Sequence, residues 1–308
     1  MSAEIGRLLT AMATPFKADG SVDYAAAEQL AAFLVADGSD GVVVSGTTGE
    51  SPTLNDDEKI ELVKAIKKAI PSKAVVAGTG SYDTHHSVKL SERAMKAGAD
   101  ALLAVVPYYS KPPQDGMFLH FKAISEVGPT IMYNIQGRTA VNMTAATTLR
   151  CAQLPGIIGV KEASGDLDQI GLVCAGRPDR FKVWSGDDSW TLPIMSVGAY
   201  GVICVVSHIA GRSMKKMIEA QVKGDNDAAR KIHLGLLPVI KTLMTTAANP
   251  VPIKSVLNAM GFPAGPFRLP LVPLTDDQLA SVMEVIKEAG GLISTLPAKQ
   301  VKAGAHVA

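Results

Sequence analysis

The sequence predicts an α/β fold, namely a (β/α)8 TIM barrel with a C-terminal helical extension. Short apolar runs alternate with longer stretches of helical periodicity, which is typical of parallel strands joined by right-handed helical crossovers. Eight such runs lie within about the first 225 residues, and this number favours a closed barrel over an open sheet. The first run continues into Ala13-Thr14-Pro15-Phe16 and not into a glycine-rich dinucleotide turn, so an open doubly wound sheet is the weaker alternative.

The expected strands and helices alternate along the first part of the chain. The apolar, β-rich runs predict strands at residues 8–12, 41–45, 74–77, 101–106, 130–133, 157–161, 181–185 and 201–205. Helical periodicity predicts seven helices, at residues 23–36, 56–69, 85–97, 116–126, 145–151, 168–175 and 190–197. In a barrel of this kind the functional residues lie where the strands end, at the C-terminal face.

From Asp225 onward the strand signal stops. Helical periodicity continues at residues 226–247, 252–260 and 275–289, with Pro and Gly between the last two segments. Nothing in this part of the sequence predicts a sheet. We therefore expect a barrel at residues 1–225 and a helical extension, not a second α/β domain, at residues 226–308.

Composition excludes several classes of protein. The 308 residues include 30 Lys and Arg and 29 Asp and Glu, which gives a formal net charge of +1, and 47% of them are hydrophobic. Such a chain can bury a sizeable core and is not intrinsically disordered. The near-neutral charge, without a basic block, disfavours nucleic acid or an anionic membrane as the main partner.

Targeting and redox signals indicate a cytoplasmic protein. No apolar run approaches the roughly 18 residues that a membrane-spanning helix needs, and the N-terminus MSAEIGR lacks the apolar centre of a secretory signal. The three cysteines, Cys151, Cys174 and Cys204, have no CxxC spacing. Their small, odd number suits buried thiols in a reducing compartment.

Two of the predicted strand exits carry polar residues suited to binding a carboxylate. The second strand leads into GTTGES at 46–51, where Thr47 and Thr48 stand between glycines and offer hydroxyl and backbone N–H donors. The fifth leads into Tyr133, which can transfer protons, and Arg138, which can bind a carboxylate bidentately. Each pattern also fits an ordinary βα turn or a packed tyrosine, so neither decides the function alone.

The sixth predicted strand carries the sharpest signal. Because side chains alternate along a strand, Ile157, Gly159 and Lys161 are expected on one face. If that face lines the barrel, the Lys161 amine projects into an apolar lumen, where desolvation favours a nucleophilic amine that forms a Schiff base with a carbonyl substrate. The alternative is a rim lysine paired with Glu162 or Asp166, and the residues alone leave both possibilities open.

The sequence carries no signature of a metal or cofactor site. The six histidines show no HxxxH or HxH spacing and no cluster with cysteine. There is no P-loop, no protein-kinase signature and no GxSxG nucleophile elbow. We therefore expect no metal and no cofactor, with the chemistry carried by side chains.

Six motifs together resemble one family, the pyruvate-dependent class I aldolases. They are GTTGES at 46–51, PYY at 107–109, YN at 133–134 with GRT at 137–139, GVKEASGD at 159–166, SGDD at 185–188 and NPVPIK at 249–254. The likeness runs from LTAMATPF at 9–16 to RLPLVPL at 268–274, nearly the whole chain. It implies a (β/α)8 barrel with a helical C-terminal extension, which agrees with the interpretation of the residues.

The resemblance implies which residues perform the reaction. Lys161 matches the family lysine that forms a Schiff base with the ketone of pyruvate. Tyr133 matches the proton-transferring tyrosine, with a relay through Thr47 to Tyr109, which in the family comes from the neighbouring subunit. The implied assembly is a homotetramer made of two such dimers.

The resemblance also implies the substrate contacts. Thr48 matches the residue that holds the pyruvate carboxylate, and Arg138 matches the one that meets the carboxylate of aspartate semialdehyde. Gly186 and Ile203 match positions that lend backbone carbonyls to the site. The implied reaction is a lyase-type condensation of pyruvate with aspartate semialdehyde, in lysine and diaminopimelate biosynthesis.

Two alternatives and one departure accompany this interpretation. A sibling enzyme that cleaves or dehydrates a sugar acid shares the Lys and Tyr but lacks the arginine found here as Arg138. A catalytically silent homologue would not need both Lys161 and Tyr133. The departure is Gln136, where this branch of the family usually has Pro; a residue that regains a backbone N–H and freedom in φ is expected to loosen the segment carrying Arg138.

Many members of the family are inhibited by lysine in a cleft between subunits. At the matching positions this chain keeps Ser51 and Tyr108. It departs from the sensitive enzymes at Pro52, Asp56, Lys59, Tyr82 and His86. His86 replaces a glutamate that would pair with the ligand's ammonium group, and Lys59 adds a like charge. We therefore expect weak or absent inhibition.

Overall fold

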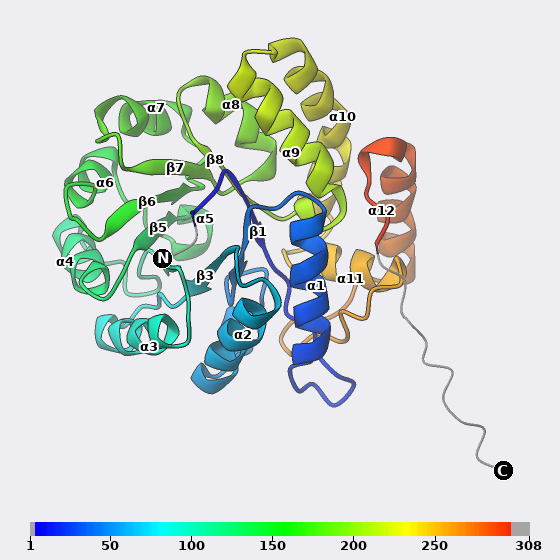
Figure 1. The fold of residues 1–308 in the computed structure, drawn as a ribbon, viewed down its shortest axis with the longest axis horizontal. Coiled ribbons are helices and arrows are strands. Elements are labelled where there is room, and N and C mark those ends of the chain that lie inside the picture. The colour runs from blue at the N-terminus through cyan, green and yellow to red at the C-terminus, as the bar shows by residue number, and fades with distance from the viewer. Residues whose placement is uncertain (1–3, 297–308) are drawn as a thin grey trace.

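The computed structural model describes residues 4–296, in which eight parallel strands close into a barrel in sequence order (Figure 1). The strands are β1 (Leu8–Ala11), β2 (Gly41–Val44), β3 (Ala74–Gly78), β4 (Ala101–Val105), β5 (Thr130–Asn134), β6 (Ile157–Glu162), β7 (Lys182–Ser185) and β8 (Gly201–Cys204). The pairing of β1 with both β2 and β8 closes the ring. The predicted fold class is confirmed, with each strand end within one residue of its expected place.

Helices surround the strands on the outside of the barrel (Figure 1). They are α1 (Tyr24–Ala36), α2 (Asp56–Ala69), α3 (Thr84–Lys96), α4 (Gln114–Ser125), α6 (Ala145–Cys151), α7 (Leu167–Gly176), α8 (Thr191–Ser196) and α9 (Ser207–Lys223). The short helix α5 (Gln136–Thr139), which was not predicted, lies instead at the carboxyl ends of the strands. All seven predicted helices are present. Local sequence explains several starts: Asn55 and Glu58 form a capping box at α2, and Asp23 and Asp166 cap α1 and α7.

Two layers of apolar side chains hold the barrel together. Inside it, Leu9, Val43, Val76, Ile131 and Trp184 belong to one buried cluster. A larger cluster fills the space between the strands and the surrounding helices. Because alternate residues of a strand face opposite sides, strands buried on both faces need nearly continuous apolar runs, such as AVVAG in β3.

In β6, the prediction that Ile157, Gly159 and Lys161 share one face is wrong for Ile157. Ile157 packs in the outer cluster, whereas Gly159 and Lys161 face the interior. The register between β5 and β6 is irregular there, with one extra residue after Ile157, so the alternation of faces starts again one residue later. Gly159 is required because β7 and the Trp184 ring leave no room for a side chain: a Cβ at this glycine would stand 2.2 Å from the Lys182 carbonyl oxygen and 2.6 Å from the ring.

The helix after the last strand, α9, was not expected from the sequence. It packs against β1 and against the first helix of the extension. Its first turns are buried and include polar residues, and Ala210 inside it has non-helical φ and ψ, so the periodic apolar face that reveals most helices is interrupted. His208 is fully buried in this segment, where the backbone N–H of Ala13 donates to its Nε2 over 3.0 Å.

The C-terminal extension packs on one side of the barrel (Figure 1). It contains α10 (Asn226–Thr245), α11 (Val251–Ala259) and α12 (Asp276–Glu288). In the described part of the chain no strand follows β8, as expected, and residues 297–308 lie outside that part. Lys254 of α11 donates to the Glu50 carboxylate over 2.6 Å, and both side chains are fully buried. This ion pair joins the extension to the loop after β2.

The structure bears on two expectations, one about membrane-spanning helices and one about the cysteines. Across residues 4–296, no helix combines the length and the apolar character needed to cross a membrane. Cys151, Cys174 and Cys204 are buried free thiols, as expected. Burial raises the pKa of Cys151 to about 12, which makes this thiol a packing group and not a nucleophile.

Candidate active site

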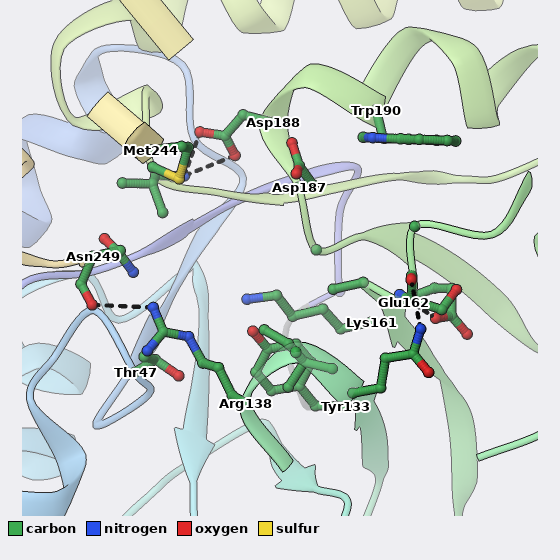
Figure 2. Close-up of a pocket in the computed structure, with 18 of the residues that line it drawn as sticks. Thr47, Tyr133, Arg138, Lys161, Glu162, Asp187, Asp188, Trp190, Met244 and Asn249 are labelled. Carbon is green, nitrogen blue, oxygen red and sulfur yellow. Dashed lines mark hydrogen bonds between the residues drawn. The ribbon is translucent and has the colours of Figure 1, made fainter. Parts of the chain in front are cut away.

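A cavity of about 550 Å³ opens at the carboxyl ends of the strands. Loops of the barrel and a segment of the extension line it, and the Lys161 amine points into the space between them (Figure 2). Six of the eight predicted site residues lie on its wall, namely Thr47, Thr48, Tyr133, Arg138, Lys161 and Gly186. The fold therefore gathers residues from loops that are distant in the sequence, as expected for the C-terminal face of a barrel.

Lys161 extends from the end of β6 and is only 6% exposed. Its Nζ lies 4.2 Å from the centroid of the Tyr133 ring, which stands beside it on β5. Gly186, just after β7, provides room for the lysine, because a Cβ there would stand 3.2 Å from the Lys161 Cε. The Lys161 amine therefore lies against the face of the Tyr133 ring at the cavity wall.

The alternative of a paired rim lysine is not what the structure contains. Glu162 accepts from the Asn134 side-chain amide over 3.1 Å and from the Ser164 backbone N–H over 2.8 Å. Burial raises the pKa of Glu162 in spite of these bonds. Asp166 caps α7. Among the described residues, the hydrogen bonds of these two carboxylates go to other partners and not to Lys161.

The loop after β2 presents Thr47 and Thr48 to the cavity. Gly49 lets this loop lie against the end of β1, since a Cβ there would stand 3.1 Å from the Met12 carbonyl oxygen. Glu50 adopts a left-handed φ of 56° and is held by its buried ion pair with Lys254. Backbone packing and one ion pair thus fix the two threonines.

The segment that carries Arg138 is a helical turn, α5. Gln136 stands at its first position, where a backbone N–H has no partner inside the helix in any case. The Gln136 Nε2 donates to the Ser164 carbonyl over 3.2 Å, which ties α5 to the loop after β6. The segment is a regular turn with an added hydrogen bond, which would oppose the expected loosening; the loosening itself stays a prediction.

Two predicted residues lie away from this cavity wall. Tyr109 is 92% exposed and has a left-handed φ of 69°, a conformation that is rare for a bulky residue. Ile203 lies in β8 with its side chain in the barrel interior, and its backbone pairs with Leu9 of β1. Neither is among the residues of the described chain that line the cavity. A single chain therefore does not bring Tyr109 to Lys161.

Several lining residues appeared in the sequence analysis only as parts of motifs. Asp188 is fully buried, accepts from the backbone N–H groups of Val205 and Val206 over 3.0 and 2.6 Å, and so joins the ends of β7 and β8. Burial raises the pKa of Asp188. Asn249 comes from the extension and contacts Thr48, 201 positions away. No local spacing could reveal a contact over that separation.

A second cavity, of about 690 Å³, shares Thr47 and Tyr133 with the first. It is lined by all seven positions considered for lysine binding, namely Ser51, Pro52, Asp56, Lys59, Tyr82, His86 and Tyr108. The His86 Nε2 and the Asp56 carboxylate are 2.9 Å apart. Burial lowers the pKa of Lys59.

The site combines an amine, a phenol, hydroxyls and a guanidinium group. Within residues 4–296, no group of three or more His, Cys, Asp or Glu side chains is arranged to hold a metal ion. A buried amine can attack a ketone, a phenol can move protons, and Thr48 and Arg138 are donors suited to carboxylates. The arrangement fits imine chemistry on a substrate that carries a carboxylate.

Comparison with known proteins decides the family. Residues 4–289 match the model of the dihydrodipicolinate synthetase family. The chain belongs to this family. The 4-hydroxy-tetrahydrodipicolinate synthase of Moorella thermoacetica is 52% identical over 288 residues, which cover 92% of this chain and 98% of that protein. The family resemblance indicated by the six motifs is confirmed.

Solved structures of the family share this fold. The enzyme of Cyanidioschyzon merolae with lysine bound has a TM-score of 0.90 and 42% identity, covering 92% of this chain and 98% of that one. The chloride-inhibited dihydrodipicolinate synthase of Acinetobacter baumannii, complexed with pyruvate, has a TM-score of 0.90 and 34% identity. That alignment covers 93% of this chain and 99% of the other.

Proposed function

We propose that this member of the dihydrodipicolinate synthetase family condenses pyruvate with L-aspartate 4-semialdehyde through a Schiff base on Lys161. The product is 4-hydroxy-tetrahydrodipicolinate. The observation that carries the proposal is the buried amine of Lys161, which faces the same cavity as Tyr133 and as Thr48 and Arg138, two side chains with donors suited to a carboxylate. A relative 52% identical is named for this activity, and a solved relative holds pyruvate.

Lys161 supplies the nucleophile for the first half of the reaction. Its amine attacks the ketone carbon of pyruvate, and loss of one water leaves a protonated imine. The positive nitrogen withdraws electrons from the former ketone carbon, so the methyl group loses a proton and the enamine forms. Thr48 donates to the pyruvate carboxylate and so directs the ketone carbon toward Lys161.

The second half of the reaction joins the two substrates. The enamine carbon attacks the aldehyde carbon, and the aldehyde oxygen takes up a proton to become a hydroxyl group. The amine of the second substrate then attacks the imine carbon and displaces the Lys161 amine, which closes the ring. Arg138 holds the carboxylate of this substrate, and the backbone carbonyls of Gly186 and Ile203 act as acceptors in the site.

Proton transfer runs from Tyr133 through Thr47 to Tyr109 of a partner subunit in this proposal. Each of these hydroxyl groups can both donate and accept a proton. The nearly full exposure and left-handed backbone of Tyr109 support the role, because strained backbone concentrates at functional sites. A relay completed by a partner's residue requires at least a dimer, and the family resemblance supports a homotetramer made of two such dimers. The buried free thiols support a cytoplasmic location.

A coupled assay tests the proposed function. Pyruvate and aspartate semialdehyde are supplied together, and in parallel the enzyme is offered 2-keto-3-deoxygluconate and N-acetylneuraminate. We expect condensation of the first pair and no comparable release of pyruvate from either sugar acid, because Arg138 suits an aldehyde partner that carries its own carboxylate, which the aldehyde halves of these sugar acids lack. Release of pyruvate from a sugar acid without condensation would establish the sibling activity instead.

A further inference from the structure

Asn249 reaches the active-site cavity from the segment between α10 and α11. Its side-chain Nδ2 donates to the Thr48 Oγ1 over 3.0 Å. Its backbone carbonyl accepts from the Arg138 Nη2 over 3.2 Å, a bond that Figure 2 shows. Asn249 thus joins the two residues that the proposed function assigns to the two substrate carboxylates.

The bond to Thr48 decides what the threonine hydroxyl can do. A hydroxyl group has one proton to donate and two lone pairs that accept. Because Asn249 donates to the oxygen, the Thr48 proton points away from the amide and stays free for another acceptor. Thr48 is buried and lines the cavity, so a ligand in the cavity can be that acceptor. An ionised carboxylate gains most from such a bond, since charge-assisted hydrogen bonds are the strong ones.

The amide of Asn249 is poorly arranged for stability alone. Its Oδ1 is buried and has no hydrogen-bond partner among the described residues. A buried acceptor left unpaired costs about 1–3 kcal/mol, a cost that a purely stabilising side chain would avoid. The same amide offsets part of this cost through the hydrogen bond that its Nδ2 donates to Thr48 at the cavity wall. The arrangement therefore favours a functional role for the side chain.

We propose that Asn249 is a positioning residue for the pyruvate carboxylate and acts through Thr48. By donating to Oγ1, the amide keeps the hydroxyl proton of Thr48 directed at the carboxylate. The inference rests on the proposed function, because it takes Thr48 as the carboxylate donor. The hydrogen bond from Arg138 ends on the backbone carbonyl of Asn249, which a change of side chain leaves in place. A change of the Asn249 side chain should therefore affect pyruvate and leave the second substrate almost unaffected.

The test measures pyruvate saturation in the absence of the second substrate. The full-length enzyme is incubated with increasing pyruvate and reduced with borohydride, and initial labelling of Lys161 gives the half-saturating concentration. For Asn249→Ala we expect this concentration to rise about tenfold, with unchanged labelling at saturation. For Asn249→Asp, similar in size, we expect a larger rise, because a carboxylate accepts the Thr48 proton and repels the ligand.

A double-mutant cycle separates positioning from a general structural role. Thr48→Val removes the hydroxyl and should also raise the half-saturating pyruvate concentration. Adding Asn249→Ala to Thr48→Val should then change nothing further, because the effect passes through that hydroxyl. Asn258→Ala is the matched control: this amide on α11 donates to the Gly265 carbonyl over 2.9 Å, away from the cavity, and its loss should leave the value unchanged.

The possible results distinguish this inference from the proposed function. If Thr48→Val raises the half-saturating concentration and Asn249→Ala does not, the inference is overturned and the proposed function stands. If neither variant changes it, the assignment of Thr48 is wrong and the inference falls with it. Additive effects in the double variant overturn the inference. The inference is also overturned if Asn249→Ala raises the KM for the second substrate as much as it raises the half-saturating pyruvate concentration, because general loosening of the site would produce both changes.

Discussion

Gln136 occupies the first position of α5, and its side chain bonds the Ser164 carbonyl over 3.2 Å. Gln136→Pro removes this exposed hydrogen bond and fixes φ. Loss of the hydrogen bond loosens the segment that carries Arg138, whereas a fixed φ makes it more rigid. Each effect amounts to about 1 kcal/mol or less of free energy. In steady-state assays we expect the KM for aspartate semialdehyde to change less than about threefold. A change of tenfold or more, without a similar change in Gln136→Ala, would contradict this interpretation.

Buried histidines set part of the pH dependence of stability. The His208 Nε2 accepts from the Ala13 N–H, so its Nδ1 donates to the Val205 carbonyl over 2.8 Å. Burial lowers the pKa of His208 to about 4, and that of His120 also to about 4. Both imidazoles are therefore neutral in the folded protein at pH values where the unfolded chain already binds protons.

Protonation in the unfolded state should weaken the fold in acid. The contribution of neutral His208 to the free energy of unfolding is fully present above pH 6.5 and is lost as the pH falls to about 4. Since one pKa unit corresponds to about 1.4 kcal/mol, the loss is about 3 kcal/mol. Urea titrations at pH 7 and about pH 4.5 should show a smaller loss for His208→Gln than for wild type. His85→Gln, at an exposed position, should lose as much as wild type. Equal losses for wild type and His208→Gln would disprove the linkage.

At the scale of elements, the second cavity is built where the loop after β2 meets the starts of α2 and α3. Asp56 could attract the ammonium groups of lysine, but His86 already lies 2.9 Å from its carboxylate and Arg93 4.0 Å from it. Lys59 adds a cation that burial leaves poorly solvated. The cavity thus lies at the positions matched to the family's lysine cleft, but five of the seven side chains there differ and its charge pattern is unfavourable to a cationic ligand.

Lysine should consequently inhibit this enzyme weakly or not at all at millimolar concentration. The measurement is a titration of L-lysine at half-saturating pyruvate. The double variant Lys59→His with His86→Glu should be inhibited at lower lysine concentration than wild type, because one cation is removed and one anion is added. Strong inhibition of the wild-type enzyme below the millimolar range would refute this prediction.

Most elements could be predicted because each strand is a short apolar run between turn residues and most helices have one apolar face. Three features escaped this logic. The helix α5 has only four residues, too few to show a helical period. The extra residue after Ile157 reverses the face of that residue, although the side of Lys161 was predicted correctly. The start of α9 is buried on all sides and broken at Ala210, so its sequence has no helical period to detect.

At the scale of the whole molecule, the extension supplies part of the wall of the candidate active site. Lys254 pairs with Glu50 inside the protein, and Asn249 contacts Thr48 and Arg138. In the pairs Lys254–Glu50 and Asn249–Thr48, the two residues are about 200 positions apart in the sequence. The motifs could indicate which residues matter, but only the folded chain shows which of them touch, because contact over such separations is set by tertiary packing.

Assembly can be tested through Tyr109, which a single chain leaves exposed. Tyr109→Phe and Lys161→Ala should each be nearly inactive. When the two variants are co-expressed, mixed dimers contain one intact site, made of Lys161 from one chain and Tyr109 from the other. Random pairing should then restore about a quarter of the wild-type activity. Absence of complementation despite mixed dimers, or a fully active monomer by sedimentation, would rule out the shared site.

The central claim is that Lys161 forms the imine with pyruvate. Borohydride reduction in the presence of pyruvate, followed by peptide mass spectrometry, tests it most directly. The structure predicts one pyruvate-derived group per chain, on the peptide that contains Lys161. Lys161→Ala should take up no label, while Lys182→Ala, altered at the start of β7, should be labelled like wild type. Unchanged labelling of Lys161→Ala, or a label on another lysine of the wild-type chain, would contradict the claim.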